Sequence, residues 1–567
     1  MELPKILKVR VGLPIFVFLL LVGIFIRVWK IDSTPISLFG DEIDVGLQAY
    51  SIATTGKDYF GNRYPIMFHS FSEYRLPMQL YLDAPFVKLV GLNAYGVRPP
   101  SLIMGLLSLL LFYFLVKELF VKKLALITTI FLAFSPWHIN FSRQANDAGI
   151  ILPFIIGGTL FFLKGIKEYK YLLISTFLFA MSFYSYAIAT VFTPLFALSL
   201  IVIYRKRVFR YQPIKLILLV ILGLLLLLPY IIFTYKGISS QRFSNISAIQ
   251  EDFLMGEVVA RRRWSESFLT RVFYNRKTIA TEVVLKNYVK SFSVSFLFTE
   301  GDPNMRQSIE GFGQMYHFDI VLIFLGLWFL FYKNAKEKAN EKYLLVFSFL
   351  AISPLASALT KDGGTHASRL ILMVIPLVIL SGIGFKVLLE STKGYKKKVL
   401  VAIFITVAVL DITRFIHRYF VIWKNESWRF FQYGFEEAVS YVNENENDYQ
   451  KVILDSTYEP MLPRFLFYSQ YDMRLFQKQF SGDRYEDNII NGVNGFSLAD
   501  KYYFGELAKP IENLATPGSL VIANGEKDVT NPGIFSNPNL KLLKVISSPT
   551  NIPIFYIFTA NNAGVNN

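Results

Sequence analysis

The sequence predicts a mainly α-helical fold: a polytopic bundle of about 11 transmembrane spans, followed by a small α/β domain. Three observations lead to this prediction. Of the 567 residues, 53% are hydrophobic and 16% aromatic, a composition typical of multi-span membrane proteins. Apolar runs long enough to cross a hydrocarbon core of about 30 Å recur over the first three quarters of the chain. The remaining quarter alternates helix-like and strand-like patterns.

The apolar runs predict spans at 12–29, 100–116, 123–141, 148–166, 171–187, 188–204, 213–235, 317–333, 342–358, 368–388 and 397–414. The two runs between 171 and 204 are also compatible with one long broken helix. The first run contains VFLLLVGIF, which is too apolar, and followed by too few small residues, for a cleaved signal peptide. We therefore interpret it as the first membrane anchor.

The distribution of charge predicts which segments face the cytoplasm. The net charge is +16, and the segments KILKVR, KELFVKK, KGIKEYK, RKRVFRYQPIK, YKNAKEKANEK and STKGYKKK alternate with poorly basic ones along the chain. Because Lys and Arg are enriched on the cytoplasmic side, the N-terminus is predicted to be cytoplasmic in a cell (plasma) membrane. The regions near 30–99, 236–316 and beyond about 415 then face outward. Basic residues placed in this way set topology and argue against nucleic-acid binding.

The outward regions carry their own secondary-structure signals. Ile43, Leu47 and Tyr50 share one helical face, and LPMQLYLDAPFVKLVG is also amphipathic, so the first outer region predicts helices lying in the membrane interface. In the tail, FEEAVSYVNENEN predicts a helix, and QKVILDS, GSLVIAN and IPIFYIFT predict strands. The expected domains are a transmembrane catalytic domain over 1–416 and an extracytoplasmic α/β domain over 417–567.

A tight group of acids follows the first span. The segment GDEID contains Asp41, Glu42 and Asp44, and carboxylates are costly next to a bilayer. One of them can cap the following helix, since anions suit a helix N-terminus. One can also act as a general base at the membrane surface, and the two roles are compatible. Asp147, in SRQAND after the third span, is an ordinary helix-cap residue or a second acid facing the same side.

Basic residues on the outer face are the candidates for binding an anion. They are Arg75, Arg143, Arg261–Arg263, Arg306, and the pair His366 and Arg369. Each one alone is expected to touch lipid headgroups or to pair with a carboxylate, whereas together they can clamp a phosphate, which guanidinium groups bind with two parallel hydrogen bonds.

Other kinds of site find little support in the sequence. Cysteine is absent, which excludes disulfides and thiolate metal sites. Neither a Walker loop nor a dinucleotide-binding glycine motif is present. The histidines lack metal-ligand spacing, although an acidic pair can hold a divalent cation weakly.

The order of these motifs resembles the GT-C superfamily of integral-membrane glycosyltransferases, in particular the branch of protein O-mannosyltransferases and lipid A aminoarabinose transferases. The similarity covers most of the membrane region. The segments that carry it are GDEIDVGLQAYSIATTGKDYFGNRYP, EYRLPMQLYL, VRPPSLIMGLLSLLLFYFLVKELF, FSPWHINFSRQAND, FLFTEGDPNMRQSIEGFGQMYHFDIVLIFLGL and SPLASALTKDGGTHASRLILMVIPL. The Trp-Trp-Asp run of oligosaccharyltransferases is absent, which argues against transfer of whole oligosaccharides to asparagine.

The resemblance implies a function. It implies a hexosyl- or pentosyltransferase, mannosyltransferase-like, that moves a sugar from a polyprenyl-phosphate donor to a hydroxyl of a glycan, lipid or protein, with inversion. Asp41 matches the catalytic carboxylate, Glu42 its companion, and Asp147 a second acid. Because arginine can neutralise the leaving phosphate, no metal or other cofactor is required.

The resemblance also implies which basic residues bind the lipid phosphate. Arg75 matches a basic residue that contacts this phosphate, although one residue separates it from Pro77 and the usual double proline is missing. Arg306, and Arg369 with the neighbouring His366, lie in matching motifs.

Two other functions remain open at this point. A lipid-linked sugar flippase or secondary transporter is also polytopic and basic, but it is expected to show paired repeats and midplane charges rather than large outer regions. An O-antigen ligase-type enzyme would concentrate basic residues in one large outer loop, as RRRW in 236–316 does.

Overall fold

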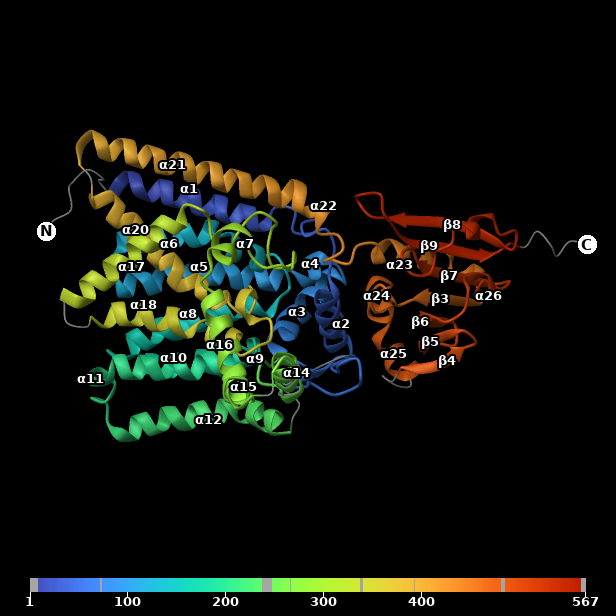
Figure 1. The fold of residues 1–567 in the computed structure, drawn as a ribbon, viewed down its shortest axis with the longest axis horizontal. Coiled ribbons are helices and arrows are strands. Elements are labelled where there is room, and N and C mark those ends of the chain that lie inside the picture. Colours follow the sequence, from blue (N-terminus) through green and yellow to red (C-terminus); the bar gives the residue numbers. More distant parts are fainter. Residues whose placement is uncertain are drawn as a thin grey trace, which may run out of the picture. The chain divides into compact units, whose positions relative to one another are not determined.

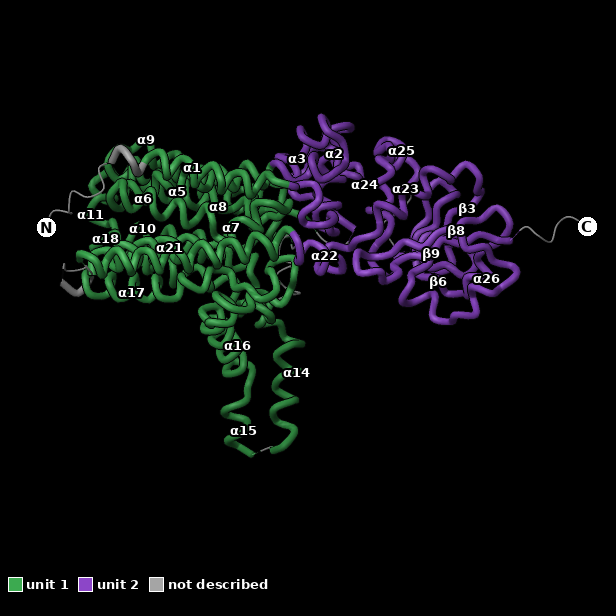
Figure 2. The backbone as a smooth tube through the Cα atoms, turned by 90° about the horizontal axis from the view of Figure 1, so that it is seen from above, with its two compact units in different colours: residues 1–29, 73–79, 100–420 green, residues 30–72, 80–99, 421–567 purple. Residues whose placement is uncertain are grey.

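The computed structural model describes residues 9–71, 74–236, 247–265, 267–336, 340–391, 393–480 and 485–561, and the chain divides into two compact units (Figures 1 and 2). The bundle unit comprises residues 1–29, 73–79 and 100–420. The α/β unit comprises residues 30–72, 80–99 and 421–567, so it combines the chain that follows the first helix with the C-terminal tail.

The bundle unit is built from long apolar helices joined by short segments. Its helices are α1 (Val9–Val28), α5 (Pro99–Leu119), α6 (Lys122–Phe134), α7 (Pro136–Ser142), α8 (Asp147–Gly165), α9 (Lys170–Ser185), α10 (Ala189–Ile203), α11 (Arg205–Val208), α12 (Pro213–Tyr235), α14 (Glu251–Arg262), α15 (Phe268–Phe273), α16 (Arg276–Lys290), α17 (Asp319–Lys336), α18 (Glu341–Ile352), α19 (Leu355–Ala358), α20 (Val374–Ser391) and α21 (Gly394–His417). Short π- or 3-10-helical turns lie at Ser295–Thr299, Gly363–Thr365, Ile371–Met373 and Arg418–Trp423.

Each of the predicted spans coincides with helical structure, and α9 and α10 are separate helices. Within the described ranges, six helices are long and apolar enough to cross a membrane, and a seventh is added if α6 and α7, bent by 61°, form one span. The apolar stretches Leu13–Val28 and Ala189–Ile203 are shorter. The multi-pass character is therefore confirmed, whereas the full number of crossings stays a prediction.

The α/β unit contains a seven-stranded sheet with the strand order β4-β5-β6-β3-β7-β9-β8. The strands are β3 (Lys451–Asp455), β4 (Glu486–Ile490), β5 (Val493–Leu498), β6 (Tyr502–Leu507), β7 (Ser519–Asn524), β8 (Leu540–Ser547) and β9 (Pro553–Ala560). The central strand β3 runs parallel to β6 and β7, and the outer pairs are antiparallel. The predicted tail strands are confirmed as β3, β7 and β9.

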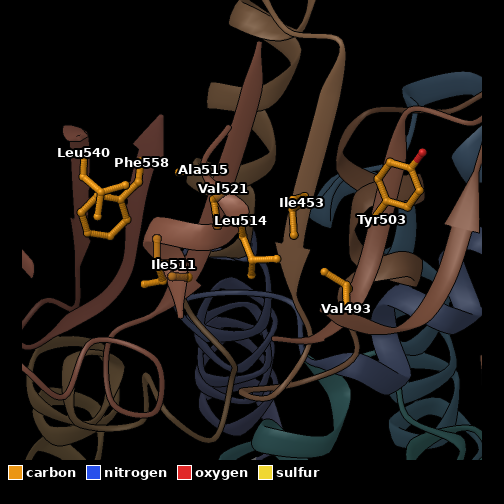
Figure 3. Packing of buried hydrophobic residues seen from close by; sticks show 10 residues of the cluster. Ile453, Val493, Tyr503, Ile511, Leu514, Ala515, Val521, Leu540 and Phe558 are labelled. Carbon is orange, nitrogen blue, oxygen red and sulfur yellow. The ribbon is translucent and has the colours of Figure 1, made fainter. Parts of the chain in front are cut away.

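The core of this unit lies against the middle of the sheet. Every residue of β7 is buried and β3 is buried after its first residue, as expected for parallel strands covered on both faces. The short helix α26 (Ile511–Leu514) places Ile511 and Leu514 next to Ile453 and Val521 (Figure 3). The other helices of the tail are α22 (Lys424–Glu426), α23 (Phe435–Asn445), which was predicted from the sequence, α24 (Met461–Tyr468) and α25 (Met473–Gln479).

The first outer region supplies helices to both units. They are α2 (Gly40–Thr55), α3 (Pro77–Val90) and α4 (Ala94–Val97), with two-residue strands β1 (Phe68–His69) and β2 (Tyr74–Arg75). The helices predicted around Ile43 and after Arg75 are thus present, and their place in a membrane interface stays a prediction.

Helix α2 is packed firmly within the α/β unit. A Cβ atom at Gly46 would lie 2.7 Å from the ring of Phe467 in α24 and 2.7 Å from a methyl group of Val97, so glycine allows this close approach. Gln477 in α25 donates hydrogen bonds from Nε2 to Ser51 Oγ (3.2 Å) and to the Asp58 carbonyl (2.9 Å). The tail therefore holds the helix that carries the acidic group.

The alternation of basic segments predicts that Tyr332 and the C-terminal tail lie on opposite sides of the membrane. Reporter fusions placed after Tyr332 and after Asn567 should therefore give opposite readings, with the tail outside. The same reading at both positions would contradict the predicted topology.

Candidate functional site

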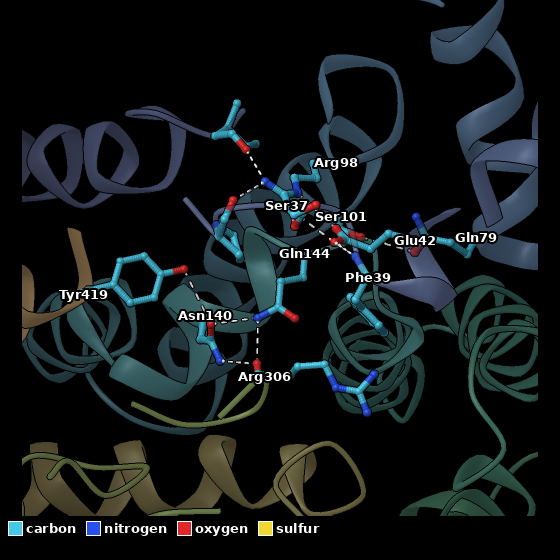
Figure 4. Close-up of polar contacts among 12 residues, drawn as sticks. Ser37, Phe39, Glu42, Gln79, Arg98, Ser101, Asn140, Gln144, Arg306 and Tyr419 are labelled. Carbon is cyan, nitrogen blue, oxygen red and sulfur yellow. Dashed lines mark hydrogen bonds and ion pairs between the residues drawn. The ribbon is translucent and has the colours of Figure 1, made fainter. Parts of the chain in front are cut away.

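Glu42 is held in a fully buried ion pair with Arg98 (Figure 4). Arg98 Nε lies 3.0 Å from Glu42 Oε1, and neither side chain is exposed. All five N–H groups of the guanidinium donate: two to the Glu42 carboxylate, and three to the carbonyl oxygens of Ile31, Pro35 and Ser37. The Phe39 amide also donates to Glu42 Oε2 at 3.4 Å. The Glu42 carboxylate is thus engaged in fixing the start of α2.

Asp41 lies in the same first turn but has a partly exposed side chain. The preceding residue, Gly40, donates its N–H to Gln432 Oε1 at 2.7 Å. Arg464 of α24 also donates to Gln432, and its guanidinium nitrogen lies 3.1 Å from where a Cβ of Gly40 would be. Burial lowers the pKa of Arg464, while nearby acids, Glu459 foremost and Asp41 among them, favour its charged form. Asp41 is therefore an acid at a helix N-terminus with a guanidinium close by.

Asp44, the third acid of the group, faces the interior of the α/β unit. Its Oδ1 accepts hydrogen bonds from Tyr59 (2.6 Å) and Ser70 (2.8 Å), and its side chain is buried. Through these hydrogen bonds Asp44 links α2 to Tyr59 and Ser70 in the segment that follows the helix.

Asp147 and Arg75 belong to the bundle unit. Asp147 is the first residue of α8 and half-buried, and the cap itself is Asn146, whose side chain accepts from the Ala148 amide at 2.8 Å. Because Asn146 occupies the capping position, Asp147 is not needed as the cap. Arg75 ends β2 just before α3, with 9% of its surface exposed.

The loop that carries Arg306 is fixed through its backbone (Figure 4). The Arg306 carbonyl accepts hydrogen bonds from Asn140 Nδ2 (3.2 Å) and from Gln144 Nε2 (2.9 Å), and both donors lie in the segment FSPWHINFSRQAND. The Arg306 side chain is half-buried, with Nε 3.4 Å from Asn304 Oδ1. The segments 136–147 and 301–318, both singled out in the sequence, therefore meet in the bundle unit.

His366 lies close to Arg369 and interacts electrostatically with both Arg369 and Arg306. Arg369 Nη1 donates to Thr360 Oγ1 at 2.8 Å and pairs with Asp362 at 2.5 Å. Burial, and next the Arg369 guanidinium, lower the pKa of His366 to about 4. At physiological pH its imidazole is therefore neutral, so the positive charge of this group comes from the two arginines.

Arg143, another outer arginine noted in the sequence, is fully buried at a helix end. Its Nη1 donates to the carbonyl oxygens of Ile26 and Arg27 at 2.7 Å each, at the C-terminal end of α1, and the guanidinium lies over the rings of Tyr419 and Phe420. A cation there complements the helix dipole.

Two residues near the acidic group were not predicted from the sequence. Arg98 lies in the segment VRPP. This segment is part of the resemblance to the GT-C superfamily, but the resemblance implies no role for the arginine. Arg464 lies in MLPRFLFY, where a single arginine in an apolar helix is the only signal. The contacts of Arg98 with Glu42 and of Arg464 with Gln432 join residues that are far apart in the sequence. Local sequence patterns do not predict such contacts.

Loss of the Glu42 carboxylate should destabilise the α/β unit strongly. Glu42→Gln leaves the buried Arg98 charge uncompensated, which costs about 3–5 kcal/mol. A matched control is Glu506→Gln, which breaks the half-exposed pair of Glu506 with Lys527 and should cost about 0–1 kcal/mol. Thermal unfolding of the purified protein measures both changes. Equal destabilisation by the two variants would contradict the role assigned to the buried pair.

Comparison with known proteins finds a family that matches part of the chain and solved structures with a similar fold. Residues 75–233 match the family described as dolichyl-phosphate-mannose-protein mannosyltransferase. No curated protein sequence matches the chain. The fold is similar to that of ArnT from Cupriavidus metallidurans bound to undecaprenyl phosphate, with a TM-score of 0.50 and 12% identity over 98% of this chain and 99% of that one.

The oligosaccharyltransferase of Archaeoglobus fulgidus has a similar fold. Its complex with Zn and sulfate gives a TM-score of 0.50 at 14% identity, over 95% of this chain and 72% of that one. AglB of the same organism, in complex with an inhibitory peptide and a dolichol-phosphate, gives a TM-score of 0.46 at 12% identity. The match covers 81% of this chain and 63% of that protein's length. The matched segment is thus similar to the dolichyl-phosphate-mannose-protein mannosyltransferase family, and the fold of nearly the whole chain is similar to that of ArnT.

Proposed function

We propose that this protein transfers a sugar from a polyprenyl-phosphate donor to an acceptor hydroxyl on the outer face of the membrane, with inversion at the sugar. The observation that carries the proposal is the fold shared over nearly all of both chains with an ArnT crystallised with undecaprenyl phosphate. The match of residues 75–233 to a family described by a dolichyl-phosphate-mannose donor supports the same class of donor.

Asp41 is the general base in this proposal. The two neighbouring acids have different surroundings: the Glu42 carboxylate is engaged by Arg98, whereas the Asp41 side chain is partly exposed. A base must reach the proton of a hydroxyl that arrives from outside, within about 3 Å. We therefore assign the role of base to the partly exposed Asp41, and to Glu42 the role of positioning the turn that carries it. Asp147, at the start of α8, is proposed as a second acid.

Arginines neutralise the phosphate that leaves with the lipid. Arg75 is the first candidate, and Arg306 and Arg369, with the neutral His366, are further ones. Arg369 is already paired with Asp362, which reduces its capacity to bind a second anion. Because a phosphate ester is a good leaving group once its developing charge is neutralised, the proposed step needs no metal or other cofactor.

The proposal is tested by incubating the purified protein with a radiolabelled polyprenyl-phosphate sugar and a panel of glycan, lipid and protein acceptors. Transfer of label to an acceptor, with release of polyprenyl phosphate, is the expected result. A transporter would instead move the labelled lipid between the leaflets of proteoliposomes without breaking the sugar–phosphate bond. This outcome would contradict the proposal.

Asp41→Asn should lower the rate of transfer by about 10²–10⁴ and leave donor binding unchanged, because the amide cannot accept the hydroxyl proton. A suitable control is Asp32→Asn, which changes an exposed carboxylate in the same outer region and should transfer normally. Single-turnover rates and donor-lipid binding measure the two effects. Near-normal turnover by Asp41→Asn would exclude Asp41 as the base.

Arg75→Ala should weaken the use of donor by roughly tenfold to a hundredfold, since a charge-assisted contact with phosphate contributes about 1.5–3 kcal/mol. Arg75→Lys keeps the charge but not the paired hydrogen bonds, so it should fall between wild type and Arg75→Ala. The measurement is the transfer rate as a function of donor concentration.

The control is Arg63→Ala, at an exposed arginine of the first outer region. The alternative is that Arg75 only pairs with a carboxylate such as Glu73, which lies outside the described residues. Because only 9% of Arg75 is exposed, loss of such a pair would lower the thermal stability and leave the donor response unchanged. An unchanged donor response in Arg75→Ala would move the phosphate site to Arg306 or Arg369.

A further inference from the structure

We propose that the helical hairpin formed by α14, α15 and α16, residues 247–265 and 267–291, is a membrane-surface element that inserts its far end among anionic lipid headgroups of the outer leaflet. The hairpin belongs to the bundle unit and projects sideways from it, across the direction in which the long helices run (Figure 2). The proposed function assigns no role to the hairpin. The experiment that tests its contact with lipid does not depend on sugar transfer.

The base of the hairpin is fixed at the end of a candidate membrane span. Tyr288 donates to the carbonyl oxygen of Ala351 (3.0 Å), and Asn287 Nδ2 donates to that of Thr360 (2.7 Å). The Ala248 amide donates to the Leu359 carbonyl at 2.8 Å. The segment Glu341–Ala358 is apolar enough to cross a membrane, so these contacts attach the base to the C-terminal half of this candidate span and to the residues that directly follow it.

The two arms hold each other in a fixed shape. Leu254, Val258 and Ile279 form a small buried core between α14 and α16. Ion pairs of Arg261 with Glu282 and of Arg276 with Glu251 join the arms across this core. The hairpin is thus an ordered projection.

The far end exposes an unusual number of large apolar side chains. The exposed fractions are 81% for Trp264, 79% for Phe268, 63% for Leu269 and 66% for Phe273. A patch of exposed apolar side chains indicates a surface that contacts a partner or a membrane. Trp and Phe side chains are suited to the headgroup region of a bilayer.

The positive charge of the far end indicates that the surface it contacts is an anionic lipid surface. Residues 261–277 contain six arginines and lysines and a single acid, and two of the six, Arg261 and Arg276, pair with Glu282 and Glu251. The guanidinium of Arg263 lies 4.6 Å from the ring centre of Trp264, so cation and aromatic ring are presented together. Basic residues next to apolar ones on a surface element are the pattern of interfacial membrane helices.

The absence of cysteine from the sequence allows a direct test. A single cysteine is introduced as Trp264→Cys, labelled with an environment-sensitive fluorophore, and the full-length protein is placed in lipid nanodiscs with and without phosphatidylglycerol. Phe535→Cys, at an exposed phenylalanine of the α/β unit, is the control position. Quenching by spin-labelled lipids and by aqueous iodide reports the surroundings of each label.

The label at position 264 should be blue-shifted, quenched by lipid and protected from iodide in anionic nanodiscs, while the control label behaves as in water. Adding Arg263→Glu and Arg271→Glu should lower the ratio of embedded to exposed label by about tenfold or more. A label at 264 that stays accessible to iodide, as the control does, would overturn the proposal. Equal embedding in neutral and anionic nanodiscs would overturn its electrostatic part.

Discussion

The buried ion pair of Glu42 with Arg98 is the interaction on which the candidate site depends. Two desolvated charges are costly, and the cost is offset only when their hydrogen-bonding capacity is filled. Here all five guanidinium N–H groups find acceptors, three of them carbonyl oxygens between Ile31 and Ser37. The pair therefore fixes both the approach to α2 and its first turn, in which the Asp41 side chain is partly exposed and that of Glu42 is fully buried.

The α/β unit extends this constraint to the tail of the chain. Gln432 accepts from the Gly40 amide, Gln477 binds the C-terminal half of α2, and Arg464 lies beside the first turn. Residues from the tail thus order the helix that bears the proposed base. The tail is therefore a structural part of the region that carries the proposed base, and changes in its helices are expected to affect the proposed transfer.

Much of the fold could be predicted from the sequence, because hydrophobic periodicity and length determine where helices and buried strands form. The helices near the predicted spans and the strands β3, β7 and β9 follow from such local patterns. The roles of Asp41 and Glu42 could not be separated in the same way: adjacent acids look alike in a sequence, and Arg98, which distinguishes them, is brought in by tertiary packing. The position of α2 within the α/β unit was also unpredictable, since contacts with α24 and α25 join distant segments.

The most direct test of this account is hydrogen–deuterium exchange over residues 31–56 in wild type, Asp41→Asn and Glu42→Gln. If Glu42 orders the turn and Asp41 is left for chemistry, exchange in Asp41→Asn should equal that of wild type, and exchange in Glu42→Gln should rise across this stretch as local opening becomes easier. Equal loosening by both substitutions, or none by Glu42→Gln, would contradict the division of roles between the two acids.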